Sequence, residues 1–189
     1  MTPQIYPVAV EYGLTPPGGS SHIVDALNRD IKSFVSGTLD QKLKACIEFS
    51  YLFYTSNGAQ LEEVLSKDPL LIKVLVGVLE NPSQPTVLRL EVIQTVSVIG
   101  RCTPNIQIIL CNQGIIELLT DILMDRRMDM RQWAAHCLSL LMIKNFDPKR
   151  PAWSSPKLKV GLEDATSDDW SKWPHNAASE VLETLTLSS

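Results

Sequence analysis

The sequence predicts an all-α fold, a short α-solenoid of about three repeats, and three observations support this prediction. Apolar residues recur at the spacing of one helix face, as at Ile23, Leu27 and Ile31. Strand patterns are nearly absent, and the runs rich in β-branched residues have the length and the ends of helices. Three long segments also align with one another without gaps, over 43–54, 88–99 and 130–141.

Capping and breaking residues set the expected boundaries of the helices. A serine at 20–21 starts the first helix and Gly37 ends it, and the second starts at Thr38 or Asp40. Pro85 suits a first helical turn, because its missing N–H group would have no partner there. In chain order, the expected helices cover 20–36, 40–56, 60–67, 70–81, 86–100, 103–111, 114–125 and 128–145.

The aligned segments define a repeat of a short, a medium and a long helix. The long helices start 45 and 42 residues apart, and the medium helices before them align as well. A single unit cannot bury its apolar face, whereas stacked neighbours bury a continuous core. The residues that correspond in this alignment are Leu43, Leu88 and Met130; Ile47, Val92 and Ala134; Tyr51, Val96 and Leu138; and Tyr54, Ile99 and Leu141.

Residues 103–141, TPNIQIILCNQGIIELLTDILMDRRMDMRQWAAHCLSLL, resemble one complete armadillo repeat. In that family a glycine leads from a short first helix into an apolar second helix, and an Ala-rich third helix ends in Leu-Ser-x-Leu. Here Leu70 replaces the glycine in the second repeat, and the first repeat lacks the short helix. The residues that carry the match are Gly114, Ile116, Leu119, Ile122, Leu123, Ala134, Ala135, Leu138, Ser139 and Leu141.

The resemblance implies a right-handed superhelix that binds proteins, often along a groove lined by the third helices. Peptide-clamping members carry an asparagine near the end of each third helix and a tryptophan one turn before it. This sequence has Phe53, Val98 and Leu140 at the asparagine positions, and Phe49, Gln94 and His136 at the tryptophan positions. Because this ladder is absent, an importin-like grip on an extended basic peptide is not expected.

We expect three segments: a flexible N-terminal arm over 1–19, an armadillo-like domain over 20–145, and a Pro- and Trp-containing tail over 146–189. The three repeats are expected at about 20–55, 56–101 and 102–145. The tail holds three of the four tryptophans and ends in a short predicted helix, NAASEVLETLTL. It either docks back on the last repeat, serves as a partner-binding motif, or is disordered. Ser155-Pro156 and Ser167 resemble phosphorylation motifs of low specificity.

Composition and charge argue against several classes of protein. A net charge of −4 and a pI of about 5.4 do not suit a nucleic-acid binder. The longest apolar run, LLIKVLVGVL, is too short to cross a membrane. The four cysteines show neither C-x-x-C pairing nor a histidine at metal spacing: Cys46, Cys102, Cys111 and Cys137. We therefore expect reduced thiols, no metal, no cofactor, and a location in the cytoplasm or also in the nucleus.

A few residues stand out as candidates for binding a partner. Trp133 is either a groove anchor or the cover of the open end of the array. His136 does not pair with Cys137, because neighbouring helical residues point about 100° apart. A basic cluster between two helices either docks an acidic partner or is an ordinary exposed turn. The partner-binding candidates are Trp133, His136, Gln94, Arg126, Arg127, Arg131, Trp153, Trp170 and Trp173.

No phosphate-binding, zinc-protease or nucleophile-elbow motif is present, so we expect no catalytic residue. The predicted function is a non-catalytic protein–protein interaction adaptor or assembly factor, which binds a protein through the long-helix face, the tail, or both. The first alternative is a structural subunit of a larger cytoskeletal or ciliary assembly, in which the end of the array stacks on a neighbour. The second is an enzyme with an unrecognised site. Partner identity and oligomeric state stay open.

Overall fold

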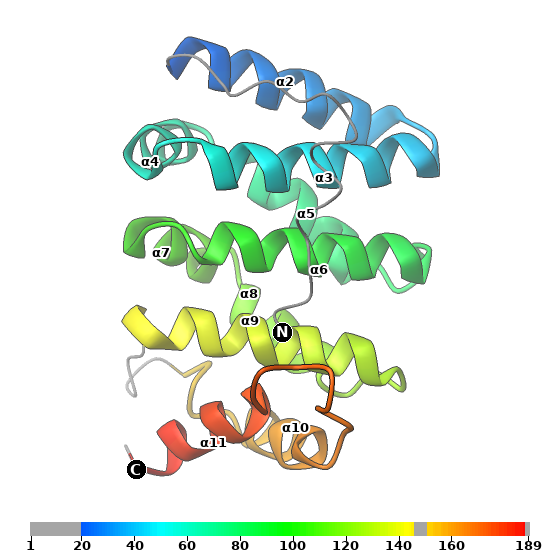
Figure 1. Ribbon diagram of the computed structural model, residues 1–189, viewed down its shortest axis with the longest axis vertical. Helices are drawn as coiled ribbons and strands as arrows, with labels where there is room; N and C mark the ends of the chain where they lie inside the picture. Colours follow the sequence, from blue (N-terminus) through cyan, green and yellow to red (C-terminus); the bar gives the residue numbers. More distant parts are fainter. Residues whose placement is uncertain (1–19, 146–150, 188–189) are drawn as a thin grey trace. The chain divides into compact units, whose positions relative to one another are not determined.

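The computed structural model describes residues 20–145 and 151–187, and over these residues every regular element is an α-helix (Figure 1). The predicted all-α class is therefore confirmed. The arm expected at 1–19 lies outside the described residues. In chain order the helices are α2 (Ser20–Ser36), α3 (Leu39–Thr55), α4 (Gly58–Lys67), α5 (Leu70–Glu80), α6 (Thr86–Gly100), α7 (Pro104–Asn112), α8 (Ile115–Ile122), α9 (Met128–Asn145), α10 (Pro156–Thr166) and α11 (Ala177–Leu187).

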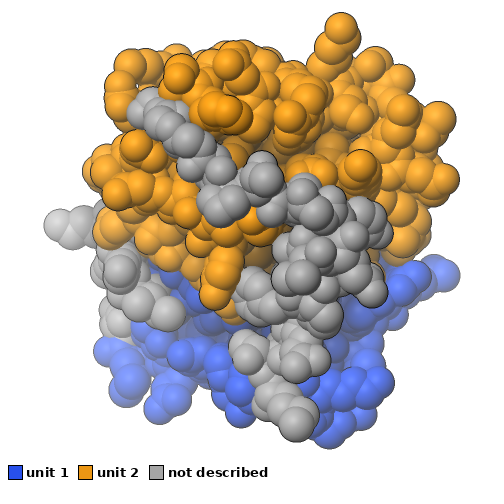
Figure 2. All heavy atoms as spheres, turned by 45° about the horizontal axis from the view of Figure 1, so that its top comes forward, with its two compact units in different colours: residues 1–4, 114–189 blue, residues 5–113 orange. Residues whose placement is uncertain are grey.

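The chain divides into two compact units (Figure 2). Of the described residues, unit 2 comprises 20–113 and holds α2 to α7, whereas unit 1 comprises 114–145 and 151–187 and holds α8 to α11. The border falls at the turn before α8, inside the third expected repeat. The expected division into an arm, a repeat domain and a tail stays a prediction.

Local capping explains where the helices of unit 2 begin. Thr38 is the N-cap of α3: its hydroxyl accepts a hydrogen bond from the Gln41 N–H at 3.4 Å, and the Gln41 side chain accepts one from the Thr38 N–H at 2.8 Å. This reciprocal pair selects Thr38 over Asp40 as the start. Asn57 caps α4 by accepting a hydrogen bond from the Ala59 N–H at 2.9 Å.

Equivalent helices of successive repeats pack together in unit 2. Figure 1 shows α2, α3 and α6 side by side, and the short helices α4 and α7 contact each other. Between α3 and α6, the fully buried Thr95 hydroxyl accepts from the Ser50 hydroxyl at 3.3 Å. Between α4 and α7, the Glu62 carboxylate accepts from Thr103 at 2.8 Å and from Asn105 at 2.5 Å. Polar links thus fix the register of both helix pairs.

The register predicted for α3 is wrong by two residues. Tyr54, aligned with the buried Ile99 and Leu141, is 63% exposed, and the other three aligned residues of this helix are half-buried. The buried face of α3 carries Ala45, Phe49 and Leu52 instead, in the places that Val92, Val96 and Ile99 hold on α6. A shift of two residues turns a helix by about 200°, so nearly the opposite face is buried.

The physical reason lies in the partner helix of α3. Its sequence is apolar on two faces, so periodicity alone does not tell which one is buried. Helix α2 determines which face of α3 is buried. Its Phe34 ring meets the Phe49 ring edge-on with centroids 6.0 Å apart, and both residues are buried. The second face of α3, with Leu43, Ile47 and Tyr51, therefore remains half-buried at the surface.

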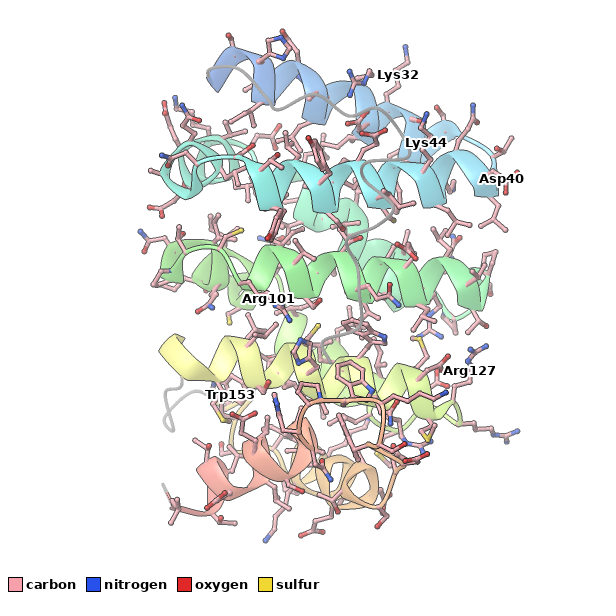
Figure 3. The ribbon with its side chains drawn as sticks, in the orientation of Figure 1. Lys32, Asp40, Lys44, Arg101, Arg127 and Trp153 are labelled. Carbon is pink, nitrogen blue, oxygen red and sulfur yellow. The ribbon has the colours of Figure 1, made fainter. Side chains whose placement is uncertain are left out.

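In unit 1 the tail packs on the two preceding helices. Helix α10 contacts α8 and α9, and α11 contacts α9 and α10. Figure 3 labels Trp153, which is only 2% exposed and lies in the turn before α10. Docking on the chain itself is thus what residues 151–187 show. The other buried apolar residues of the tail are Ala152, Leu158, Leu162, Ala165, Ala177, Ala178 and Val181.

Helix α10 was not expected from the sequence, whereas the terminal helix α11 was. Ser155 occupies the N-cap position of α10 and Pro156 its first turn, a pair that often begins a helix. The same dipeptide also resembles a phosphorylation motif. Gly161 explains why α10 packs closely, since a Cβ there would lie 2.9 Å from the Leu123 side chain.

Replacing Gly114 by alanine should lower the free energy of unfolding by about 1–2 kcal/mol, because its φ of 77° is in the left-handed region. The matched control is Gly77→Ala on the exposed face of α5, where an added Cβ meets no atom within 4 Å. That change should raise the free energy of unfolding by about 0.5–1 kcal/mol. Urea denaturation followed by circular dichroism measures both, and equal effects would contradict the expectation.

Leu138→Ala should lower the free energy of unfolding by about 2–5 kcal/mol, because Leu138 of α9 is fully buried and the substitution leaves a cavity. Leu187→Ala removes the same atoms from a side chain that is 81% exposed, and we expect a change below about 0.5 kcal/mol. Thermal denaturation of the two variants compares them directly. A Leu138→Ala variant as stable as the control would mean that α9 is not part of the core.

Candidate functional site on helix α9

Five of the nine partner-binding candidates meet in unit 1, where the segment between α10 and α11 crosses α9. We call this segment, residues 167–176, the strap; it is not helical, and Figure 1 shows it passing alongside α9. The five residues are Arg131, Trp133, His136, Trp170 and Trp173. They come from two segments that are more than 30 residues apart in the chain, and the fold brings them to one location.

Arg131 binds the strap as a carboxylate receptor. Its Nε donates to Asp168 Oδ2 at 3.0 Å, and its Nη2 forms the second bond to Oδ1 of the same carboxylate. Its Nη1 donates to the backbone oxygens of Asp125 at 2.9 Å and Arg126 at 3.2 Å. The hydrogen bonds to Asp168 raise the pKa of Arg131 above its ordinary value. Arg131, one of the three arginines of the basic cluster, therefore already has an ion-pair partner within unit 1.

Gln132 forms hydrogen bonds with both the backbone and a side chain of the strap. It is 5% exposed, and its Nε2 donates to the Asp169 carbonyl oxygen at 2.7 Å. Its Oε1 accepts from Trp173 Nε1 at 3.2 Å. The strap thus satisfies both the NH2 group and the oxygen of the buried Gln132 amide. Removal of the strap would leave both groups without these partners, which costs free energy.

An aromatic slot completes the site. The Trp173 ring centroid lies 4.8 Å from that of Trp133 and 5.3 Å from that of His136, and these two rings lie 5.8 Å apart. Trp133 and His136 are each 7% exposed, whereas Trp173 is half-buried. Trp170 meets Trp173 edge-on, with ring centroids 5.6 Å apart, and donates from Nε1 to the Ala165 carbonyl at 2.9 Å. These spacings are typical of favourable edge-to-face aromatic pairs.

The remaining candidates lie elsewhere. Arg127, labelled in Figure 3, donates from Nε to Asp129 Oδ1 at 2.9 Å, and this bond lowers the pKa of Asp129. Arg126 is exposed, and Trp153 belongs to the core of unit 1. Gln94 lies half-buried on α6, in unit 2. Whether any of these residues binds a partner stays a prediction.

Two residues of the site were missed from the sequence, Gln132 and Asp168. Asp168 stood in the motif interpreted as a phosphorylation site, and Gln132 was passed over beside Trp133. The spacing of charged residues could not identify Asp168, because Arg131 lies 37 positions earlier in the chain. Only the fold of the tail brings this pair together.

The corrected register also changes the ladder positions on α3. Ile47 and Tyr51, rather than Phe49 and Phe53, correspond to Gln94 and Val98 on α6 when the buried faces are matched. Neither residue restores an asparagine or tryptophan ladder, so its absence stands. On α9, a side-chain amide does bind the backbone of another segment. This amide belongs to Gln132, however, and not to position 140, where the ladder would place an asparagine.

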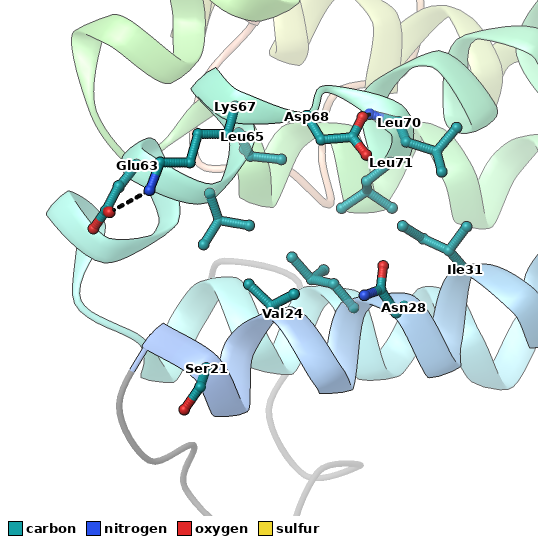
Figure 4. Close-up of a pocket in the computed structure, with 12 residues that line it drawn as sticks. Ser21, Val24, Asn28, Ile31, Glu63, Leu65, Lys67, Asp68, Leu70 and Leu71 are labelled. Atoms are coloured by element: carbon teal, nitrogen blue, oxygen red, sulfur yellow. Dashed lines mark hydrogen bonds and ion pairs between the residues drawn. The ribbon is translucent and has the colours of Figure 1, made fainter.

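Unit 2 contains a separate groove between α2 and the junction of α4 with α5 (Figure 4). Its volume is about 340 Å³, and its floor consists of the buried Leu27, Leu65 and Leu71. Glu63 and Lys67 form an ion pair of 2.7 Å on its wall. The groove is apolar, and it contains none of the partner-binding candidates. In the described part of the chain, no three His, Cys, Asp or Glu residues are grouped as metal ligands.

Comparison with known proteins identifies the fold. An engineered protein from the Northeast Structural Genomics Consortium superposes with a TM-score of 0.56 at 13% identity, over 91% of this chain and 86% of that one. The designed armadillo repeat protein YIII(Dq.V1)4CPAF, in complex with the peptide (KR)4, superposes with a TM-score of 0.52 at 14% identity, over 88% of each chain. The fold is armadillo-like.

The armadillo-like fold agrees with the resemblance found in residues 103–141. No family model matches the sequence, and neither does any curated protein. At 13–14% identity, the structural likeness concerns the fold alone. Among the described residues, no helix has both the length and the apolar character needed to cross a membrane.

Arg131→Met should lower the free energy of unfolding by about 1–3 kcal/mol, because it leaves the Asp168 carboxylate, 8% exposed, without its cation. Arg126→Met removes the same charge from an exposed neighbour, and we expect a change below about 0.5 kcal/mol. Urea denaturation followed by tryptophan fluorescence measures both variants. If Arg131→Met is as stable as Arg126→Met, the strap contact does not stabilise unit 1.

Proposed function

We propose that this protein is a non-catalytic binding scaffold, an adaptor or assembly factor that holds a segment of another protein on the face of its long helices. The proposal rests on the contacts by which α9 binds the strap. Three consecutive residues of one long helix bind a non-helical segment by its carboxylate, its backbone carbonyl and its indole. Recognition of an extended peptide commonly combines hydrogen bonds to its main chain with pockets for its side chains.

The long helices of unit 2 offer a comparable surface. The second face of α3 carries half-buried apolar residues, and Gln94 lies half-buried on α6. Half-buried apolar and amide side chains on a rigid helix suit a protein partner. The neighbouring designed armadillo protein was solved with a peptide, which supports the same use of the fold here. That peptide is basic, whereas α9 presents Arg131, so we propose a partner segment of different charge.

The first alternative, a subunit that stacks by its open end, is less well supported. In unit 1, α10 and α11 pack on α9, and their outer sides carry exposed Glu163, Asp164, Glu180 and Glu183. In unit 2, α2 packs on α3 and exposes Asp25, Arg29 and Lys32. Burial of these charged side chains in a stacked interface would cost free energy, which favours the adaptor. For its location we propose the cytoplasm or also the nucleus.

Site-specific photo-crosslinking in cells tests the proposed function. A benzophenone amino acid replaces Tyr54, which is 63% exposed on the second face of α3, in the full chain. The control carries the same group at Lys73, exposed on α5. We expect the same partner protein to be captured from Tyr54 in replicate experiments and at least about tenfold less of it from Lys73. Equal capture from both positions, or none from Tyr54, would count against binding by the long-helix face.

Truncation of the chain at Asn145, which removes the whole tail, would be a poor test of whether the tail binds a partner. Without the tail, Trp133 and His136 would lose the Trp173 ring that covers them. Newly exposed apolar surface collects non-specific partners. Substitutions in the full chain avoid this problem.

A further inference from the structure

We infer that the α9 site is a receptor for a partner segment in which an acidic residue is followed, five positions later, by a tryptophan. The strap, with Asp168 and Trp173, is then a built-in occupant that a partner must displace. The site consists of Arg131, Gln132, Trp133 and His136. This inference rests on the proposed function and names the partner chemistry of its α9 surface.

Arg131 is held in place without the strap. Arg131 Nη1 is fixed by two backbone oxygens, those of Asp125 and Arg126, at the turn before α9. The Nε and Nη2 edge of the guanidinium is left to face a carboxylate. Loss of Asp168 therefore removes the ligand but leaves the receptor oriented, which is the condition for binding a second carboxylate tightly.

The chemistry of the partner follows from what the strap offers. Arg131 takes a carboxylate in a fork, Gln132 takes a backbone carbonyl and an indole N–H, and Trp133 with His136 takes an aromatic ring. A basic segment meets Arg131 with like charge. A segment without an aromatic residue leaves the slot unfilled. An acidic–tryptophan segment satisfies all of these groups at once.

The strap is held less firmly than the helices on either side of it. Asp169, Ser171, Lys172 and other strap residues are exposed, and Trp170 and Trp173 are only half-buried. Helices α10 and α11 keep their own contacts with α9 and with each other. Local opening of a polar loop takes less free energy than unfolding of packed helices. The strap can therefore leave α9 while α10 and α11 stay docked.

A peptide-binding experiment with the full chain tests the inference. The probe is a fluorescein-labelled peptide of residues 165–176, ATSDDWSKWPHN. The strap of the protein is weakened by Asp168→Asn with Trp173→Ala, and a second variant carries Asp168→Asn alone in case the first does not fold. A tethered strap competes at an effective concentration on the order of millimolar. We therefore expect both variants to bind the probe at least about tenfold more tightly than the native chain.

Matched controls separate recognition from general loosening. Glu163→Gln removes an exposed carboxylate from α10, outside the strap and outside the α9 site, and it should leave probe binding at the native level. Adding Arg131→Met to the weakened strap should lower binding at least about tenfold, and so should a probe with Asp168→Asn. Circular dichroism and light scattering verify that each variant is folded and monomeric.

Three outcomes would overturn the inference. The folded variants bind the probe no better than the native chain; binding does not depend on Arg131; or the variants dimerise with exchanged straps, so that the occupant is a second copy of this chain. Failure of the proposed function is recognised separately. If the probe binds as expected but Tyr54 captures no partner in cells, the α9 receptor stands and the adaptor role of the long-helix face does not.

Discussion

Helix α9 is buried on every side over two full turns, because each residue from 132 to 139 is buried. An eight-residue stretch of this kind needs neighbours all round, and the sequence of α9 shows it in the lack of one apolar stripe. In unit 1 the tail supplies much of that cover, through α10, α11 and the Trp173 ring on Trp133 and His136. The conformation of the last 37 described residues, 151–187, depends on this requirement.

Much of the fold could be predicted from local signals, because capping and breaking residues act over a few positions. Thr38, Asn57 and Gly114 mark helix starts that the structure shows. Helix α10 was missed although its start signal is equally local, because Ser155 and Pro156 also suit a modification motif. The face of α3 could not be predicted at all, since it depends on Phe34 of another helix. Local chemistry sets helix ends, whereas tertiary contacts choose between two apolar faces.

The candidate site shows the same division. Tryptophans stood out in the sequence because large aromatic residues rarely lie in unstructured tails, and three of them meet α9 or its neighbours. Trp153 is an instructive exception, since it fills the core rather than the site. Gln132 and Asp168 were missed because a polar residue acquires its role only from the groups opposite it, and those groups lie 37 or 41 positions away in the chain.

The strap combines two roles that place opposite demands on one contact. As a cover for Trp133 and His136 it should bind tightly, since each ring it protects would otherwise meet water. As an occupant that yields to a partner it should bind weakly, because a partner's apparent affinity falls in proportion to the fraction of open chains. If about one chain in a hundred is open, the partner loses about a hundredfold in affinity. The half-buried Trp170 and Trp173, the polar residues between them, and an Arg131 oriented from its own side fit a contact tuned between these limits rather than one optimised for stability alone.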